Sequence, residues 1–176
     1  MLVNNAGITR DSTLHRMEPE QWGAVLQTNL TSCFNLCRLV IDGMRERGFG
    51  RIVNITSVAV KLPQAELGLS NGARAGLTGF VAGIAREPAA HNVTINNLLP
   101  GLIATERLKS LMAHRAEAAG VEPEQFVSEY SKRVPAGRIG KPEEFGALCA
   151  MICSQQAAYL TAQNILMDGG MYPGTM

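Results

Sequence analysis

Short apolar runs alternate with longer amphipathic segments along the 176 residues of the chain. Two of these runs, Arg51–Ile55 and Val93–Leu98, are rich in β-branched residues and are separated by a segment of helical periodicity. Such alternation is typical of βα units with parallel strands. We expect strands at Met1–Val3, Arg51–Ile55, Val93–Leu98 and Asn164–Met167, and helices at Glu18–Leu30, Thr31–Arg47, Leu69–Glu87, Thr105–Ala119, Glu122–Arg133 and Glu143–Ser154. With no internal repeat or low-complexity linker, the sequence predicts one α/β domain spanning residues 1–176.

Composition narrows the class of protein. The chain is 46% hydrophobic and 18% charged, as is usual for soluble globular proteins, and its net charge is +1. Nothing in this charge balance favours nucleic acid or a membrane surface as a partner, and no apolar run could span a bilayer. Met1–Asn5 has no basic region leading into an apolar stretch, so we expect no secretory signal and a cytoplasmic location.

Four cysteines form two pairs with i,i+4 spacing, Cys33/Cys37 and Cys149/Cys153. This spacing places both thiols of a pair on one helix face. Structural zinc sites favour C-x2-C spacing or nearby histidines, and neither is present. We therefore predict reduced, core-facing thiols and no metal site.

Several short motifs are placed where strands and helices are expected to end. They are Asn4-Asn5-Ala6-Gly7, Asn29 in Gln27-Thr28-Asn29-Leu30, Ser57 after the second strand, Pro100-Gly101 followed by Thr105, and Asp168-Gly169-Gly170. Together they resemble the short-chain dehydrogenase/reductase family, and the first sixty residues are most similar to acetoacetyl-CoA and 3-oxoacyl carrier reductases. The resemblance implies a truncated Rossmann-like parallel sheet with flanking helices, a C-terminal portion of the family's fold. It also implies active-site roles for Asn29 and Ser57, and cofactor positions at Asn5, Gly7, Pro100, Gly101 and Thr105.

Two departures from the family pattern affect its chemistry. Ser70 stands where the family has a proton-donating Tyr, and Arg74 where it has a Lys that lowers the pKa of that Tyr. A serine hydroxyl is too weak an acid for the Tyr role, and Arg74 cannot exchange protons. The 176 residues also hold no G-x-G-x-x-G turn, which cradles the dinucleotide phosphates in this family. We therefore expect no cofactor, with NADP as the alternative.

The pentapeptide Gly68-Leu69-Ser70-Asn71-Gly72 matches the G-x-S-x-G pattern of serine hydrolases. Ser70 is expected near a helix start, where backbone N–H groups and the helix dipole can stabilise an oxyanion. His114 is the best candidate for a general base, with His15 less favourable. Asp168 or Glu106 could complete a triad, and Asp11 is a weaker candidate for that place. Alternatively, Ser70 only caps its helix. Arg74 could pair with Glu66 or bind an anionic substrate group.

These observations lead to a hydrolase of small acyl esters as the favoured hypothesis, with Ser70, Ser57, His114, Asn29 and Arg74 as its catalytic residues. The alternatives are an NAD(P)H-dependent reductase of 3-oxoacyl or acetoacetyl thioesters, and a non-catalytic remnant of such an enzyme. In each case, the expected partner is a small molecule with an acyl group, or a second copy of the chain.

A second copy is suggested by two features. Gly76, Gly79 and Gly83 form a smooth face on one predicted helix, and the equivalent helix of the family packs across a dimer axis. The first strand, at Met1–Val3, would also leave an open sheet edge that favours pairing. We expect a homodimer or homotetramer.

Overall fold

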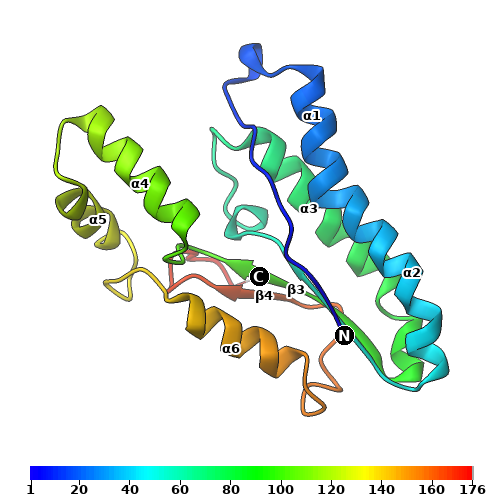
Figure 1. Cartoon of the computed structure of the whole chain (residues 1–176). Helices are drawn as coiled ribbons and strands as arrows, with labels where there is room; N and C mark the ends of the chain where they lie inside the picture. The colour runs from blue at the N-terminus through cyan, green and yellow to red at the C-terminus, as the bar shows by residue number, and fades with distance from the viewer. Residues whose placement is uncertain (176) are drawn as a thin grey trace.

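A parallel β-sheet forms the centre of the computed structural model, which describes residues 1–175 (Figure 1). Its strands are β1 (Leu2–Asn4), β2 (Gly50–Ile55), β3 (Val93–Pro100) and β4 (Asn164–Met167). They pair in the order β1-β2-β3-β4, and every pair is parallel. The predicted α/β class and parallel sheet are confirmed, and β1 lies at the predicted edge.

The helices follow the predicted sequence with ends shifted by a few residues. They are α1 (Pro19–Leu26), the π-helical segment η2 (Gln27–Thr31), α2 (Ser32–Glu46), α3 (Gly68–Ile84), α4 (Glu106–Ala119), α5 (Pro123–Ser131) and α6 (Pro142–Ile152), with short 3-10 turns η1 (Leu14–Arg16), η3 (Val58–Val60) and η4 (Pro88–His91). Prolines begin α1, α5 and α6, where the missing N–H costs no helical hydrogen bond. Within residues 1–175, every helix is too short or too polar to cross a bilayer.

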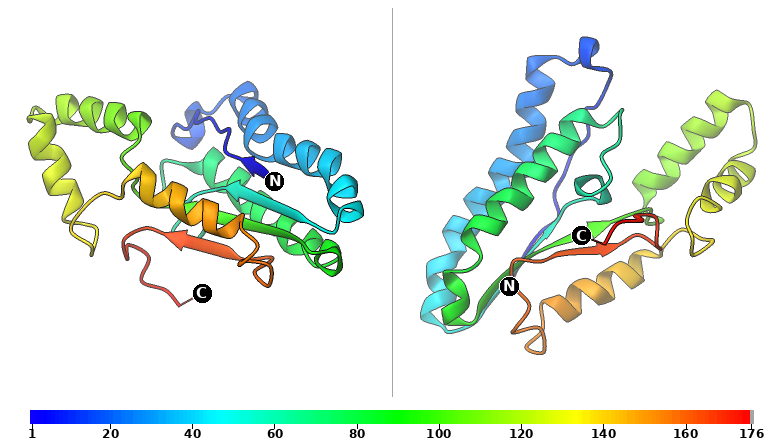
Figure 2. Two further views of the ribbon diagram at one scale, coloured as in Figure 1. Left: turned by 60° about the horizontal axis from the view of Figure 1, so that its bottom comes forward. Right: turned by 180° about the vertical axis from the view of Figure 1, so that it is seen from behind.

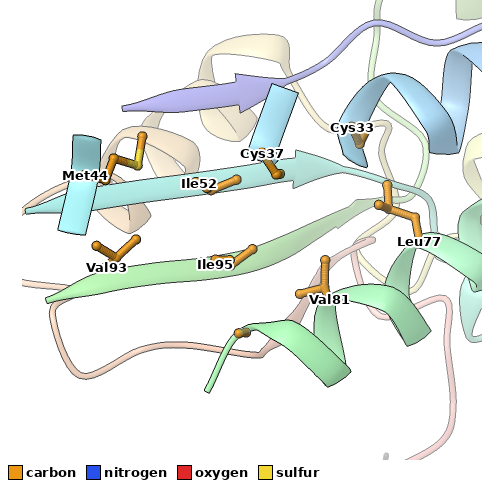
Figure 3. Close-up of a cluster of buried hydrophobic side chains, with 9 residues drawn as sticks. Cys33, Cys37, Met44, Ile52, Leu77, Val81, Val93 and Ile95 are labelled. Carbon is orange, nitrogen blue, oxygen red and sulfur yellow. The ribbon is translucent and has the colours of Figure 1, made fainter. Parts of the chain in front are cut away.

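Both faces of the sheet are covered, and the strand residues alternate between them. Ile52 and Ile95 face α2 and α3, where they meet Cys37 and Leu77 (Figure 3). Other strand residues pack with α6 on the opposite face, Val53 among them. Figure 2 shows α2 and α3 side by side on one side of the sheet, with α6 on the other. This two-sided burial leaves every residue of β2 before Ile55 and every residue of β3 before Pro100 buried.

The cysteines behave as predicted from their spacing. All four are free thiols, and Cys33, Cys37 and Cys153 are buried. Burial raises the pKa of Cys37 to about 11. These thiols therefore serve as small core residues rather than as nucleophiles.

A ladder of asparagine side chains crosses the whole sheet. The amide of Asn4 donates to Asn54 Oδ1 at 2.7 Å, Asn54 donates to Asn97 Oδ1 at 3.1 Å, and Asn97 donates to Asn164 Oδ1 at 2.8 Å. These residues are also aligned in the strand register, and the first three are buried. A slip of one residue would break every bond of the ladder, so the ladder specifies the register.

We expect Asn54→Ala to lower the free energy of unfolding by about 2–4 kcal/mol, because it deprives Asn97 Oδ1 of its donor and Asn4 of its acceptor inside the core. Chemical denaturation measures this cost. The exposed Gln64→Ala serves as a control and should change stability by less than about 0.5 kcal/mol. Equal stability of the two variants would show that the ladder contributes nothing.

Candidate active site

Because the strands are parallel, the segments that follow them gather at one edge of the sheet. Asn5–Gly7 follows β1, Ser57 follows β2, Gly101 follows β3 and Asp168 follows β4. Open α/β sheets bind ligands at this carboxyl edge. The predicted family positions therefore share one edge, although they lie far apart in the sequence.

Ser57 lies two residues beyond the end of β2 and is the N-cap of the turn η3. Its Oγ accepts a hydrogen bond from the Ala59 N–H at 3.1 Å. A hydroxyl carries one proton, and no acceptor among residues 1–175 takes it from Ser57. Ser57 can therefore donate this proton in a hydrogen bond to a ligand oxygen.

Asn29 lies in the π-helical segment η2 and is fully buried. Its amide accepts from the Ile8 N–H and donates to the Ile8 carbonyl, both at 2.9 Å. This pair of bonds ties the segment after β1 to the helical layer. The side chain thus bridges the π-helical segment to the Ile8 peptide.

Arg74 reaches from α3 across to the end of β2. Its Nη1 donates to the Ile55 carbonyl at 2.7 Å, and its guanidinium lies against Gly7 so closely that a Cβ there would clash. Burial lowers the pKa of the Arg74 guanidinium, and the charge of Arg107 acts in the same direction. Among residues 1–175 no carboxylate pairs with Arg74. The ion pair with Glu66, one of the two alternatives suggested by the sequence, is therefore absent.

Ser70 is the third residue of α3, and both of its polar groups bind one carboxylate. Its N–H donates to Asp11 Oδ1 at 3.0 Å, and its hydroxyl donates to Asp11 Oδ2 at 2.6 Å. The expectation that Ser70 caps its own helix is wrong, because Leu67 occupies the N-cap position without a side-chain bond and Asp11 supplies the cap. Asp11 was only a remote candidate from the sequence, since 59 residues separate it from Ser70.

Within residues 1–175, no histidine forms a hydrogen bond with Ser70. His114 is exposed on α4, and within residues 1–175 the Ser70 hydroxyl has no bond other than that to Asp11. His15 in η1 and His91 in η4 are also exposed. The arrangement of serine and imidazole that a hydrolase of the predicted type needs is therefore not formed.

The segment after β3 is shaped by backbone packing. A Cβ on Gly101 would lie 2.7 Å from Asp168 Cα, so only glycine fits between the ends of β3 and β4. Thr105 caps α4 by accepting from the Leu108 N–H at 3.3 Å. Beyond it, α4 and α5 enclose a hollow of about 570 Å³.

Comparison with known proteins agrees with this geometry. A family model described as enoyl-(acyl carrier protein) reductase matches residues 1–172. Acetoacetyl-CoA reductase of Shinella zoogloeoides is 39% identical over 98% of this chain and 67% of its own length. The 3-oxoacyl-[acyl-carrier-protein] reductase FabG of Vibrio cholerae is 40% identical over 98% of this chain and 66% of its own length. The crystal structure of actinorhodin polyketide ketoreductase with NADPH superimposes with a TM-score of 0.90 at 32% identity, covering 98% and 67% of the two chains.

The site and the parallel sheet thus define a Rossmann-like reductase scaffold. The chain belongs to the short-chain dehydrogenase/reductase family, and it resembles the 3-oxoacyl and acetoacetyl-CoA reductases within it. It spans about two thirds of the length of these curated relatives.

This membership corrects two predictions. The hypothesis of a serine hydrolase is wrong, because the similar proteins are reductases and the G-x-S-x-G pentapeptide lies within a helix rather than on a strand-to-helix turn. The expectation that no cofactor is used is also wrong, because the similar ketoreductase is a complex with NADPH. The absence of a G-x-G-x-x-G turn from these 176 residues argued against a dinucleotide cofactor. The family match over residues 1–172 is the stronger evidence, and it argues for one.

We expect Gly7→Ala to destabilise the fold by about 1–2 kcal/mol, because the new Cβ displaces the Arg74 guanidinium from the Ile55 carbonyl. Thermal and chemical unfolding give the value. In an Arg74→Ala background the cost should nearly disappear, which a double-mutant cycle detects. Gly146→Ala in α6 is the control, since a Cβ there meets nothing within 4 Å; an equal loss in the control and in Gly7→Ala would contradict this interpretation.

Proposed function

We propose that the chain forms the substrate side of an NADPH-dependent reductase that acts on 3-oxoacyl thioesters such as acetoacetyl thioesters. The observation that carries the proposal is the family match over residues 1–172, together with a Ser57 hydroxyl that is free to donate at the carboxyl edge. The names of the relatives give the substrate class, 3-oxoacyl and acetoacetyl thioesters.

The residues at this edge fit the nicotinamide end of a dinucleotide. Ser57 has an uncommitted hydroxyl proton, and Arg74 has guanidinium donors that no carboxylate of residues 1–175 occupies. With the backbone at Pro100–Gly101, these groups would surround the nicotinamide. The bound dinucleotide would supply hydride to the substrate carbon. Residues 1–176 do not include a glycine-rich phosphate turn, so the phosphates are not assigned to residues of this chain.

Each of the chain's own residues then has a defined task. Ser57 donates a hydrogen bond to the substrate oxygen, and Arg74 places positive charge where negative charge develops. Asn29 holds the segment around Ile8 against the helical layer. The hollow between α4 and α5 would receive the acyl part, because Leu108 and Met112 contribute apolar surface to it.

The oligomeric state and location belong to the same proposal. Phe34 and Leu39 of α2 are exposed, and a Cβ at Gly79 or Gly83 of α3 would meet nothing within 4 Å. This open apolar surface supports a homodimer, or a homotetramer that contains it. Free thiols at all four cysteines support a cytoplasmic location.

We expect Ser57→Ala to lower kcat/KM for acetoacetyl-CoA about 100-fold or more, because it removes a donor to the reacting oxygen. Oxidation of NADPH followed by absorbance measures the rate. Ser110→Ala is the matched control, because the Ser110 hydroxyl bonds only its own helix at the Glu106 carbonyl. Unchanged activity of Ser57→Ala would remove Ser57 from the reaction.

Calorimetric titration with NADPH tests the cofactor assignment separately. Binding of the dinucleotide by the purified protein supports the reductase. No binding at millimolar NADPH would reject it and would leave the non-catalytic remnant as the function.

A further inference from the structure

The chain beyond β4 turns back over the carboxyl edge of the sheet. The Asp168 carboxylate accepts hydrogen bonds from the N–H groups of Gly170 at 2.9 Å and of Tyr172 at 2.7 Å, so it fixes a turn directly after the strand. The backbone of Asp168 also lies against Gly101, where a Cβ would come within 2.7 Å of it. The turn therefore holds the segment 168–172 beside the end of β3.

Tyr172 reaches from this segment to the loop that follows β2. The Lys61 ammonium lies over the Tyr172 ring, 5.5 Å from its centroid, which is the geometry of a cation–π contact. Lys61 comes directly after η3, the turn that Ser57 caps. No carboxylate of the described residues 1–175 pairs with Lys61, and both Lys61 and Tyr172 are half-buried. The contact therefore restrains the ring at one place.

This contact spans the end of β3. The sheet order places β3 between β2 and β4, so a link from the loop after β2 to the segment after β4 crosses above β3. The turn η3 itself contacts β3. We call the segment 168–172, together with Lys61, the strap.

The strap also lies beside the hollow formed by α4 and α5. From Gly101 at the end of β3, the chain leads to Ala104, which lines that hollow. The Gly169 carbonyl accepts a hydrogen bond at 3.0 Å from the loop between α5 and α6, and the same loop lines the hollow. The strap therefore borders the way from Ser57 to the hollow.

A ring that is restrained at such a place discriminates between ligands by their shape. A linear alkyl chain can lie along the flat face of an aromatic ring. A branch on the carbon next to a ketone widens the group, and a restrained ring cannot move aside for it. One additional methyl or methylene group in a fitted apolar site changes kcat/KM about 10–200-fold. The ring can thus rank 3-oxoacyl groups by their branching.

We propose that Tyr172 is a specificity-determining residue that narrows the passage from Ser57 to the hollow, so that the site takes unbranched 3-oxoacyl groups and excludes those that are branched beside the ketone. Lys61 is a positioning residue that holds the ring. This inference rests on the proposed function and names the class of acyl group that the same site accepts.

Two isomeric substrates test this selectivity, 3-oxohexanoyl-CoA and 4-methyl-3-oxopentanoyl-CoA. Only the second is branched beside the ketone. With NADPH, the protein should show a kcat/KM about tenfold or more higher for the linear isomer. Tyr172→Ala should bring this ratio close to one, whereas Tyr172→Phe keeps the ring and should keep the ratio. An equal kcat/KM for both isomers in the unaltered protein, or an unchanged ratio in Tyr172→Ala, would overturn the inference.

Tyr159→Ala is the matched control, because Tyr159 is fully exposed in the loop before β4. It should leave the ratio unchanged. Two Lys61 variants then isolate the cation. Lys61→Arg keeps a cation over the ring and should keep the ratio, whereas Lys61→Met should lower it about threefold or more. The same ratio in both Lys61 variants would contradict the role of Lys61.

Hydrogen exchange gives a readout that needs neither NADPH nor turnover. The Tyr172 N–H is bonded to Asp168 Oδ2, and Lys61→Met should speed its exchange about threefold, while Lys61→Arg should not. Equal exchange in the two variants would contradict the restraint of the ring. If the unaltered protein reduces neither isomer while exchange responds as expected, the proposed function fails and the strap is confirmed. Reduction of both isomers with equal kcat/KM would reject this inference alone.

Discussion

The asparagine ladder is the interaction on which the rest of the structure depends. Four amides, from Asn4 to Asn164, join every strand to its neighbour, and the three from Asn4 to Asn97 are buried, where an unpaired amide is costly. Because the ladder permits one register, the carboxyl ends of the strands come level at one edge. The loops that begin at Asn5, Ser57 and Gly101 can then meet there, although the chain between them is long.

The segment after β1 is held in place by three contacts from the helices. Asn29 bonds the Ile8 peptide, the Arg74 guanidinium lies against Gly7, and Asp11 binds the start of α3 at Ser70. Each contact uses a polar group that the sequence places on a helix or loop without an evident partner. Together these contacts fix the segment from Gly7 to Asp11 against α3 and η2 at the edge of the site.

Ser70 and Arg74 replace the Tyr and Lys of the family, and the two replacements have different consequences. Arg74 retains positive charge at its position and gains a bond to the Ile55 carbonyl. Ser70 is too short to project as a tyrosine does, and its proton is bound to Asp11. The substitution therefore changes the hydrogen-bond character of the position from donor to acceptor, while the surrounding scaffold is kept.

The sequence by itself determined the order of strands and helices along the chain, the parallel α/β class and the family, because these follow from local periodicity and from short motifs such as Asn4–Gly7. It did not reveal the role of Asp11, since a carboxylate in a loop gives no signal of a partner 59 residues away. It also suggested a nucleophile at Ser70 from the pentapeptide Gly68–Gly72. That pentapeptide forms a nucleophile site only on a strand-to-helix turn, and here it lies in α3. Only the tertiary structure decided these points, because the direction of a hydroxyl proton is set by the groups that the fold brings into contact with it.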